Sequence, residues 1–214
     1  MKKLIISTLA VLALTATANA TDLPNKKKAP EAPKEVLVEK PKAASTDSLT
    51  VSYGQDLGVN LGAKVDDAYG VTYKHNLGGG FSVSGVASTT QVPNSALKQN
   101  LEAQVGYALP AFAGVAVSGK VGVGERFSTT NFPYYALYGA ADYAIGGGLT
   151  LNAISYRYRN AFDTANAYES HQLKTGVTYD ITSNYSVGVS VSRSYDNTWN
   201  ATGDAVTGAL TIKF

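Results

Sequence analysis

Hydrophobic and polar side chains alternate with a period of two along most of this chain, from residue 48 to the last residue. Such alternation is typical of β-strands that have one apolar and one polar face. It predicts about ten strands, and no segment after residue 47 has the 3.6-residue period of an amphipathic helix. The predicted strands are 48–58, 66–76, 80–90, 98–109, 114–126, 133–145, 148–159, 168–181, 184–195 and 203–214.

The connections between these strands alternate between short and long. Short turns are predicted at 77–80, 110–114, 146–148 and 182–184, and longer polar loops near 59–65, 91–97, 127–132, 160–167 and 196–202. Bacterial outer-membrane barrels have the same asymmetry, with short periplasmic turns and longer extracellular loops. An even strand number also places both ends of the folded chain on the periplasmic side. The pattern predicts an all-β fold, a closed antiparallel transmembrane β-barrel of about ten strands, with eight strands as the alternative.

The two faces of the predicted strands differ in polarity. One parity is rich in Val, Leu and Tyr, as at Leu101, Val117 and Val189, and is predicted to face lipid. The opposite parity carries Ser, Gly and charged residues and is predicted to face a polar interior. A soluble β-sandwich would turn the apolar face inward instead, so the alternation alone leaves both arrangements open.

Aromatic residues and the end of the chain favour the membrane barrel. Tyr residues lie near predicted strand ends, as aromatic girdles at two membrane interfaces require, at Tyr134, Tyr135, Tyr156, Tyr158, Tyr179, Tyr185 and Tyr195. The last strand ends on the terminal residue, with Val206, Gly208, Leu210, Ile212 and Phe214 at alternate positions. This ending resembles the C-terminal signature of bacterial outer-membrane barrels. The resemblance implies that Val206, Leu210, Ile212 and Phe214 form the signal read by the barrel assembly machinery.

Two segments precede the predicted barrel. Residues 1–20 have the three parts of a secretory signal peptide. These are the positive charges of Lys2 and Lys3, an apolar stretch, and a site of small residues that predicts cleavage after Ala20. Residues 21–47 hold four prolines, six lysines against five acids and no aromatic residue, which predicts a disordered Pro/Lys-rich periplasmic linker. Contact with the negatively charged cell wall is the alternative to a plain spacer. The stretch 21–24 looks like the start of small alphaproteobacterial outer-membrane proteins, which implies a barrel of eight or a comparable number of strands.

Charged side chains on the inward parity are the candidate functional residues. Charges in a small lumen must pair with one another or stay hydrated. Paired, Glu102 with Lys120 and Asp142 with Lys174 would fill the interior; hydrated, the same residues would line a narrow pore. Ten strands are closer to the filled eight-stranded barrels than to the water channels of much larger porins, which favours filling. The inward set is Asp56, Lys74, Glu102, Lys120, Asp142, Lys174 and Asp180.

Two arginines near the loop end of the seventh predicted strand, Arg157 and Arg159, are further lumen candidates. They would bias an entrance toward anions, or they would contact anionic lipid head groups at the rim.

The sequence does not predict catalysis or a cofactor. Residues 48–214 hold ten basic and eleven acidic residues, a near-neutral balance that does not support nucleic-acid binding. Cysteine is absent, and no metal-binding motif occurs. Of the two histidines, His171 lies near Glu169 at the loop end of a strand, where omptin-like proteases place catalytic groups, but its parity points outward, as does that of His75. A non-enzymatic protein without cofactor or metal is expected.

These observations predict an integral protein of the bacterial outer membrane, of the porin-like class, that is structural or passes small solutes. The alternative is a surface binding or adhesion barrel that acts through its extracellular loops, and an omptin-like protease is a less favoured second alternative. The expected partners are outer-membrane lipid and, during biogenesis, periplasmic chaperones and the barrel assembly machinery.

Overall fold

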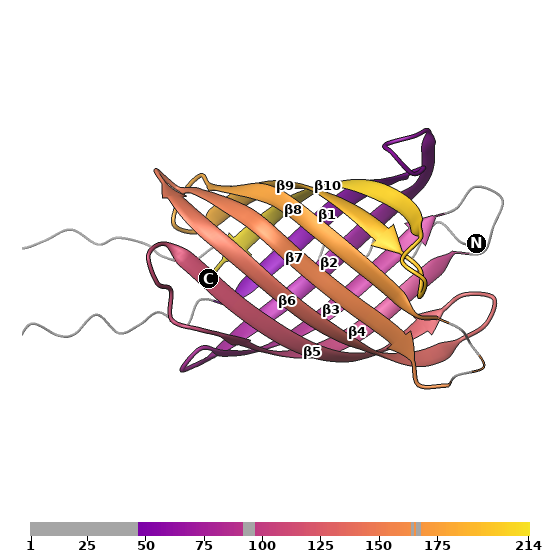
Figure 1. Cartoon of the computed structure of the whole chain (residues 1–214). Helices are drawn as coiled ribbons and strands as arrows, with labels where there is room; N and C mark the ends of the chain where they lie inside the picture. The colour runs from indigo at the N-terminus through magenta and orange to yellow at the C-terminus, as the bar shows by residue number, and fades with distance from the viewer. Residues whose placement is uncertain (1–46, 92–96, 164, 166–167) are drawn as a thin grey trace, which may run out of the picture. The chain divides into compact units, whose positions relative to one another are not determined.

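The computed structural model describes residues 47–91, 97–163, 165 and 168–214. Within them the chain forms one closed antiparallel barrel in the order β1-β10-β9-β8-β7-β6-β5-β4-β3-β2 (Figure 1). Its ten strands confirm the predicted fold class, with ten rather than eight strands. The strands are β1 (Ser48–Leu57), β2 (Lys64–Gly78), β3 (Phe81–Gln91), β4 (Lys98–Ala108), β5 (Val115–Phe127), β6 (Phe132–Gly146), β7 (Leu149–Ala161), β8 (Ser170–Asp180), β9 (Tyr185–Tyr195) and β10 (Ala201–Lys213).

The predicted signal peptide (1–20) lies outside the described residues, as does the predicted linker (21–47) except for Asp47. No helix among the residues that are described is long and apolar enough to cross a membrane.

The barrel closes through the pairing of β1 with β10. The register runs from Ser48 opposite Lys213 to Leu57 opposite Asp204. Two backbone hydrogen bonds extend this seam, from Asp47 N–H to the Phe214 carbonyl (3.0 Å) and from Phe214 N–H to the Asp47 carbonyl (2.9 Å). A closed sheet pairs the backbone groups that an open edge would expose, which hydrocarbon surroundings require.

Short turns gather at the end of the barrel where β1 begins and β10 ends, and the longer connections gather at the other end (Figure 1). The β2–β3 and β6–β7 turns are glycine triplets, Gly78–Gly80 and Gly146–Gly148, in which every residue has a positive φ. Glycine adopts this conformation at little steric cost, which explains why these turns are so short. The expected alternation is confirmed except at one pair, because the β4–β5 connection (109–114) is longer than the β5–β6 connection (128–131). The two ends are called the turn end and the loop end below.

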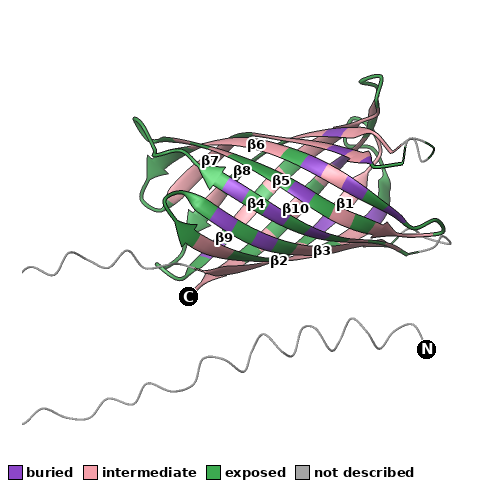
Figure 2. Cartoon of the chain, turned by 90° about the horizontal axis from the view of Figure 1, so that it is seen from below, coloured by how far each residue is buried: buried purple, intermediate pink, exposed green. Residues whose placement is uncertain are grey.

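Apolar side chains cover the outer wall of the barrel. Leu101, Val121 and Val189 are 54%, 56% and 57% exposed, and their neighbours along each strand point into the lumen. Buried and exposed residues alternate along the strands as a result (Figure 2). A soluble sandwich would bury this apolar face, so the exposed outer wall supports contact with lipid.

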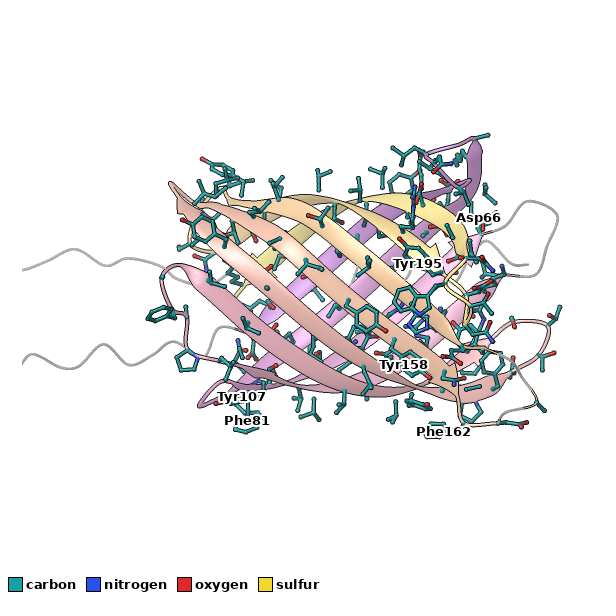
Figure 3. All side chains as sticks on the ribbon, in the orientation of Figure 1. Asp66, Phe81, Tyr107, Tyr158, Phe162 and Tyr195 are labelled. Atoms are coloured by element: carbon teal, nitrogen blue, oxygen red, sulfur yellow. The ribbon has the colours of Figure 1, made fainter. Side chains whose placement is uncertain are left out.

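Aromatic side chains lie near both ends of the outer wall (Figure 3). Phe81 and Tyr107 pack together at the turn end, with ring centroids 4.7 Å apart. Tyr158 and Phe162 lie at the loop end, where each packs against Tyr135. This arrangement is that of two aromatic girdles. Tyr134, expected in a girdle, is the exception, because it points inward and is fully buried.

Candidate functional site

The barrel divides its charged residues unequally between its two walls. By register, Asp56, Asp66, Glu102, Asp142 and Asp180 are the acidic residues of the described strands that face the lumen. The basic residues on the same face are Lys74, Lys98, Lys120, Arg126, Arg157, Arg159, Lys174 and Lys213. Eight basic against five acidic side chains give this inner wall a net charge of +3, although the barrel sequence is near neutral.

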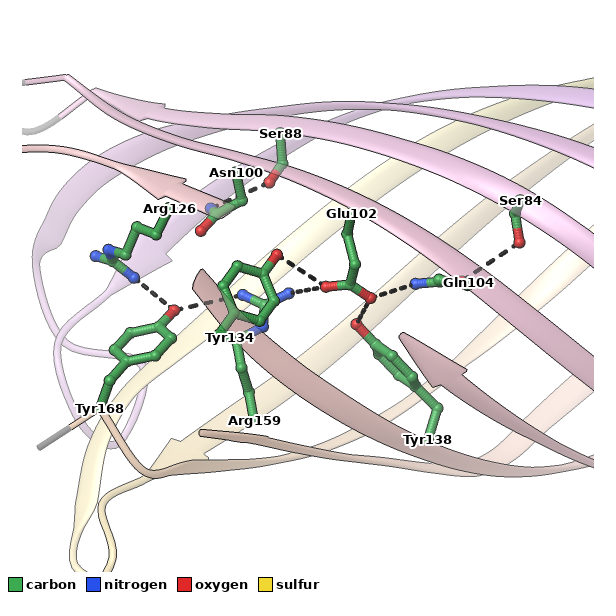
Figure 4. Close-up of polar contacts among 10 residues, drawn as sticks. All are labelled: Ser84, Ser88, Asn100, Glu102, Gln104, Arg126, Tyr134, Tyr138, Arg159 and Tyr168. Atoms are coloured by element: carbon green, nitrogen blue, oxygen red, sulfur yellow. Dashed lines mark hydrogen bonds and ion pairs between the residues drawn. The ribbon is translucent and has the colours of Figure 1, made fainter. Parts of the chain in front are cut away.

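A buried carboxylate organises the loop-side half of the lumen (Figure 4). Glu102 on β4 is 5% exposed and forms an ion pair with the Arg159 guanidinium of β7 at 2.9 Å. It also accepts hydrogen bonds from the Gln104 amide (2.8 Å) and from the hydroxyls of Tyr134 (2.9 Å) and Tyr138 (2.5 Å). The Arg159 guanidinium lies 4.5 Å from the centre of the Tyr134 ring, a cation–π contact. These five side chains, called the Glu102 network below, fill part of the lumen.

Glycines on β5 allow this network to form, because β5 lies between β4 and β6. A Cβ added to Gly122 would lie 2.5 Å from the Glu102 carboxylate, and one added to Gly124 would lie 2.7 Å from the Tyr134 ring. With no side chain on β5 at these positions, Glu102 reaches across the strand to the tyrosines of β6. Gly122 and Gly124 therefore leave the space that the side chains of Glu102 and Tyr134 occupy.

Tyr168, in the described part of the β7–β8 connection, caps the network at the loop end. Its hydroxyl accepts hydrogen bonds from Arg126 (2.6 Å) and Arg159 (3.5 Å), and its ring packs on Phe132. Burial raises the pKa of Tyr168, but the positive charges of Arg159 and Arg126 outweigh burial and place that pKa below its ordinary value. A loop residue thus extends the polar contacts of the lumen to its mouth.

The turn-side half of the lumen holds basic side chains that water can reach. Lys74, Lys120 and Lys174 point inward by register and are nevertheless exposed. Within the described part of the chain none of them forms an ion pair, and Lys120 has a cation–π contact with Tyr138 at 5.6 Å. Arg157 lies deeper, and its Nε has no hydrogen-bond partner among the described residues. These three lysines and Arg157 are called the luminal basic cluster below.

The ion pairs expected from the sequence are therefore wrong. Glu102 pairs with Arg159 rather than Lys120, and Asp142 accepts a hydrogen bond from Asn152 at 2.9 Å rather than pairing with Lys174. Each half of the lumen matches a different one of the two expected interiors. The Glu102 network occupies the loop-side half, while the lysines of the turn-side half stay in contact with solvent.

One wall of the lumen carries mainly small side chains. On β9, β10 and β1 the inward positions are mostly Ser, Thr, Gly and Ala, whereas β4 to β8 supply Glu102, the tyrosines and the arginines. The small inward residues are Ser186, Gly188, Ser190, Ser192, Ser194, Gly203, Ala205, Thr207, Ala209, Thr211, Ser48, Thr50, Ser52 and Gly54. Most of these small residues are partly exposed to solvent, so large side chains do not fill this side of the lumen completely.

A β-bulge decides where the two arginines point. The register of β7 shifts between Asn152 and Ser155. Odd-numbered residues such as Leu151 face outward before the shift, and even-numbered residues such as Tyr156 and Tyr158 face outward after it. Arg157 and Arg159 consequently face the lumen, and the expected contact with lipid head groups is wrong for both. Bulges commonly re-aim side chains in this way.

The C-terminal residues of the proposed assembly signal lie on the outer wall. Val206, Leu210 and Ile212 have the outward parity of β10. Phe214 follows the strand and stacks on Tyr73 with ring centroids 6.4 Å apart. Their role as an assembly signal stays a prediction.

Both histidines face away from the lumen. The ring of His75 contacts the Asp47 carboxylate at 2.8 Å, and hydrogen bonds from His75 and then Tyr73 lower the pKa of Asp47. His171 is 7% exposed, contacts the Tyr156 hydroxyl at 2.7 Å and lies 4.4 Å beneath the Trp199 ring. Neither ring is placed to act on a solute inside the barrel.

Sequence reasoning missed several lumen residues. Tyr138 could have been found, because it shares the inward parity with Asp142 on the same strand. The inward direction of Tyr134 was available from the same parity. Arg126 and Asp66 lie at strand ends, where the predicted boundaries made their parity unreliable. Tyr168 lies in a connection, and no pattern in the sequence indicates that it folds back into the mouth.

No protein-family model matches this chain, and no curated protein sequence matches it either. Among solved structures, an outer-membrane channel from Pseudomonas putida F1 is similar, with a TM-score of 0.53 and 10% identity over 86% of this chain and 100% of that one. The KdgM porin has a TM-score of 0.45 and 13% identity over 78% of this chain and 99% of that one. The NanC porin has a TM-score of 0.45 and 13% identity over 78% of this chain and 100% of that one. At such identities the similarity concerns the fold alone, and this chain has the fold of a porin-like outer-membrane β-barrel.

Proposed function

We propose that this protein is an integral, non-enzymatic protein of the bacterial outer membrane whose lumen passes small hydrophilic solutes. The exposed apolar outer wall and the two aromatic girdles support insertion in a membrane. Export through the predicted signal peptide, with cleavage after Ala20, and recognition of the C-terminal residues by the barrel assembly machinery belong to the same proposal.

A single observation carries solute passage. Lys74, Lys120 and Lys174 lie on the inner wall of a closed barrel and are still exposed to solvent. An inward side chain is accessible in this way only where the interior is left open beside it. The wall of small residues on β9, β10 and β1 supplies that space, and the Glu102 network narrows it toward the loop end.

Adhesion through the loops is less well supported. Trp199, the large aromatic residue of the β9–β10 connection, stacks on His171 and packs against Tyr195, so it covers the outer wall instead of forming a free tip. Phe162 packs on Tyr135 of the same wall in a similar way. Both contacts place loop aromatics at the membrane interface.

Channel activity is tested by single-channel conductance of the refolded mature protein in planar bilayers, after a heat-dependent gel shift has shown a folded barrel. Two neighbouring residues on β9 provide a matched pair of variants. Ser190→Trp places a large ring in the lumen and is expected to reduce conductance by about half or more, whereas Val189→Trp points outward and is expected to leave conductance unchanged. A silent bilayer with folded wild-type protein would refute solute passage.

A further inference from the structure

We propose that the luminal basic cluster is a binding site for small oxyanions with two or more negative charges, such as inorganic phosphate or a dicarboxylate. The inference deepens the proposed function, because a solute would reach the cluster through the lumen. Its four cationic side chains come from four strands, Lys74 from β2, Lys120 from β5, Arg157 from β7 and Lys174 from β8.

The cations of this cluster repel one another. Lys74 and Lys174 are both close enough to Lys120 for unfavourable charge–charge interaction, and Arg157 interacts unfavourably with Lys174. Like charges inside a protein-walled space are screened less than on an open surface. An anion between them would replace this repulsion with attraction.

The neighbouring carboxylates do not supply the missing negative charge. Glu102 is held by Arg159 and by three further donors, so its charge is already compensated. Asp142 accepts a hydrogen bond from Asn152 and forms no ion pair among the residues that the structure describes. Asp56 interacts favourably with Arg157, so together with Asp142 two carboxylates stand against four cations. The imbalance favours a ligand that carries more than one charge.

The donors of the cluster suit an oxyanion. Lysine ammonium groups bind phosphate and carboxylate oxygens as mobile point charges, and a guanidinium offers planar paired donors. The Arg157 Nε is buried and lacks a hydrogen-bond partner within the described residues, so this donor is left unsatisfied in the wall beside the lysines. Ser84 and Ser155 lie opposite Lys74 and Lys174 in the register and add hydroxyls to the same wall.

The first test measures ion preference in bilayers of neutral lipid, so that head groups contribute no charge. Under a tenfold KCl gradient, the sign of the reversal potential is expected to show preference for chloride, and inorganic phosphate is expected to reduce the chloride current. Lys120→Gln and Lys174→Gln are each expected to weaken the effect of phosphate about tenfold. In water, removing one unit charge about 5 Å away changes binding about fourfold for each negative charge of the anion. Lys120→Arg keeps the charge and is expected to retain the effect.

The matched control is Lys64→Gln, which removes the same charge from the outer wall. Lys64 pairs with Asp67 at 2.8 Å and is remote from the lumen face, so phosphate is expected to act on this variant as on wild type. Loss of the phosphate effect in Lys64→Gln would show a nonspecific surface effect and overturn the inference.

The outcomes separate the inference from the proposed function. A conducting channel with neither anion preference nor response to phosphate overturns the oxyanion site and leaves solute passage standing. A folded barrel without conductance refutes solute passage, and phosphorus NMR on the protein in micelles then decides the site. Phosphate resonances broadened by wild type and Lys64→Gln but not by Lys120→Gln would support the site, and unchanged resonances would overturn it.

Discussion

Replacing Glu102 with alanine is expected to destabilise the barrel strongly, because Glu102 is the acceptor for every other member of the Glu102 network. Arg159 is 9% exposed and has Glu102 as its ion-pair partner. In Glu102→Ala the guanidinium would stay in the wall without a counter-charge, and Tyr134, Tyr138 and Gln104 would lose an acceptor. Removing one partner of a buried ion pair costs about 3–5 kcal/mol.

A loss of about 4 kcal/mol, the middle of this range, lowers the ratio of folded to unfolded protein about a thousandfold. Luminal water can hydrate part of the guanidinium once the Glu102 side chain is removed, so the lower end of the range, about 3 kcal/mol or about 150-fold, is the expected value. Urea unfolding in micelles, followed by the fluorescence of Trp199, the single tryptophan of the chain, measures the free energy. The same samples on unheated gels report the folded fraction independently.

Two further variants make the measurement specific. Glu125→Gln removes an exposed carboxylate on the outward parity of β5, and its unfolding free energy is expected to change by less than about 0.5 kcal/mol. Glu102→Ala combined with Arg159→Ala removes the unpaired charge. The loss of unfolding free energy in this double variant is therefore expected to be about 2 kcal/mol smaller than the sum of the losses in the two single variants. Additive losses, or a cost below about 1 kcal/mol for Glu102→Ala, would show that the network does not stabilise the barrel.

Three other expectations follow from the structure. Deleting Phe214 is expected to block assembly in cells while the purified chain still refolds in detergent, as judged by the gel shift, and normal assembly would remove the argument for a terminal signal. Gly124→Ala is expected to cost about 2 kcal/mol in unfolding free energy because its Cβ would meet the Leu101 carbonyl oxygen at 2.4 Å, whereas Gly139→Ala, with open space around its Cβ, is expected to be close to neutral. The pKa of Asp47 is lower in the folded than in the unfolded state, so its carboxylate stabilises the barrel above about pH 4, and this contribution is lost as pH falls through the lowered pKa. In Asp47→Asn, urea titrations at several pH values should show a smaller loss of stability on the acid side.

The alternation of side chains predicted the barrel because period two reports which wall a residue faces. It could not predict ion pairs, because a pair also requires the right height along neighbouring strands. Glu102 and Lys120 lie on adjacent strands and share the inward parity, but Glu102 is opposite Gly124 while Lys120 is opposite Gly106. Four residues of strand separate those positions, about 13 Å. Register, and not parity, determined the partner of Glu102.

Local irregularity limited the prediction in a second way. If the alternation continued unbroken from Leu149 and Leu151, Arg157 and Arg159 would lie on the lipid side. The bulge between Asn152 and Ser155 reverses that parity, and no glycine or proline marks it in the sequence. Arg159 reaches Glu102 only because of this extra residue.

The distribution of charge argues that the lumen is more than packing. A barrel with a purely structural interior gains no stability from inward cations that lack partners, since they repel one another and must keep water around them. The Glu102 network shows that this chain can place a carboxylate against a buried arginine where compensation is needed. Lys74, Lys120 and Lys174 have no such partner among the described residues, and they lie beside the wall of small residues where space is available. Unpaired cations next to open space are what a path for anions requires.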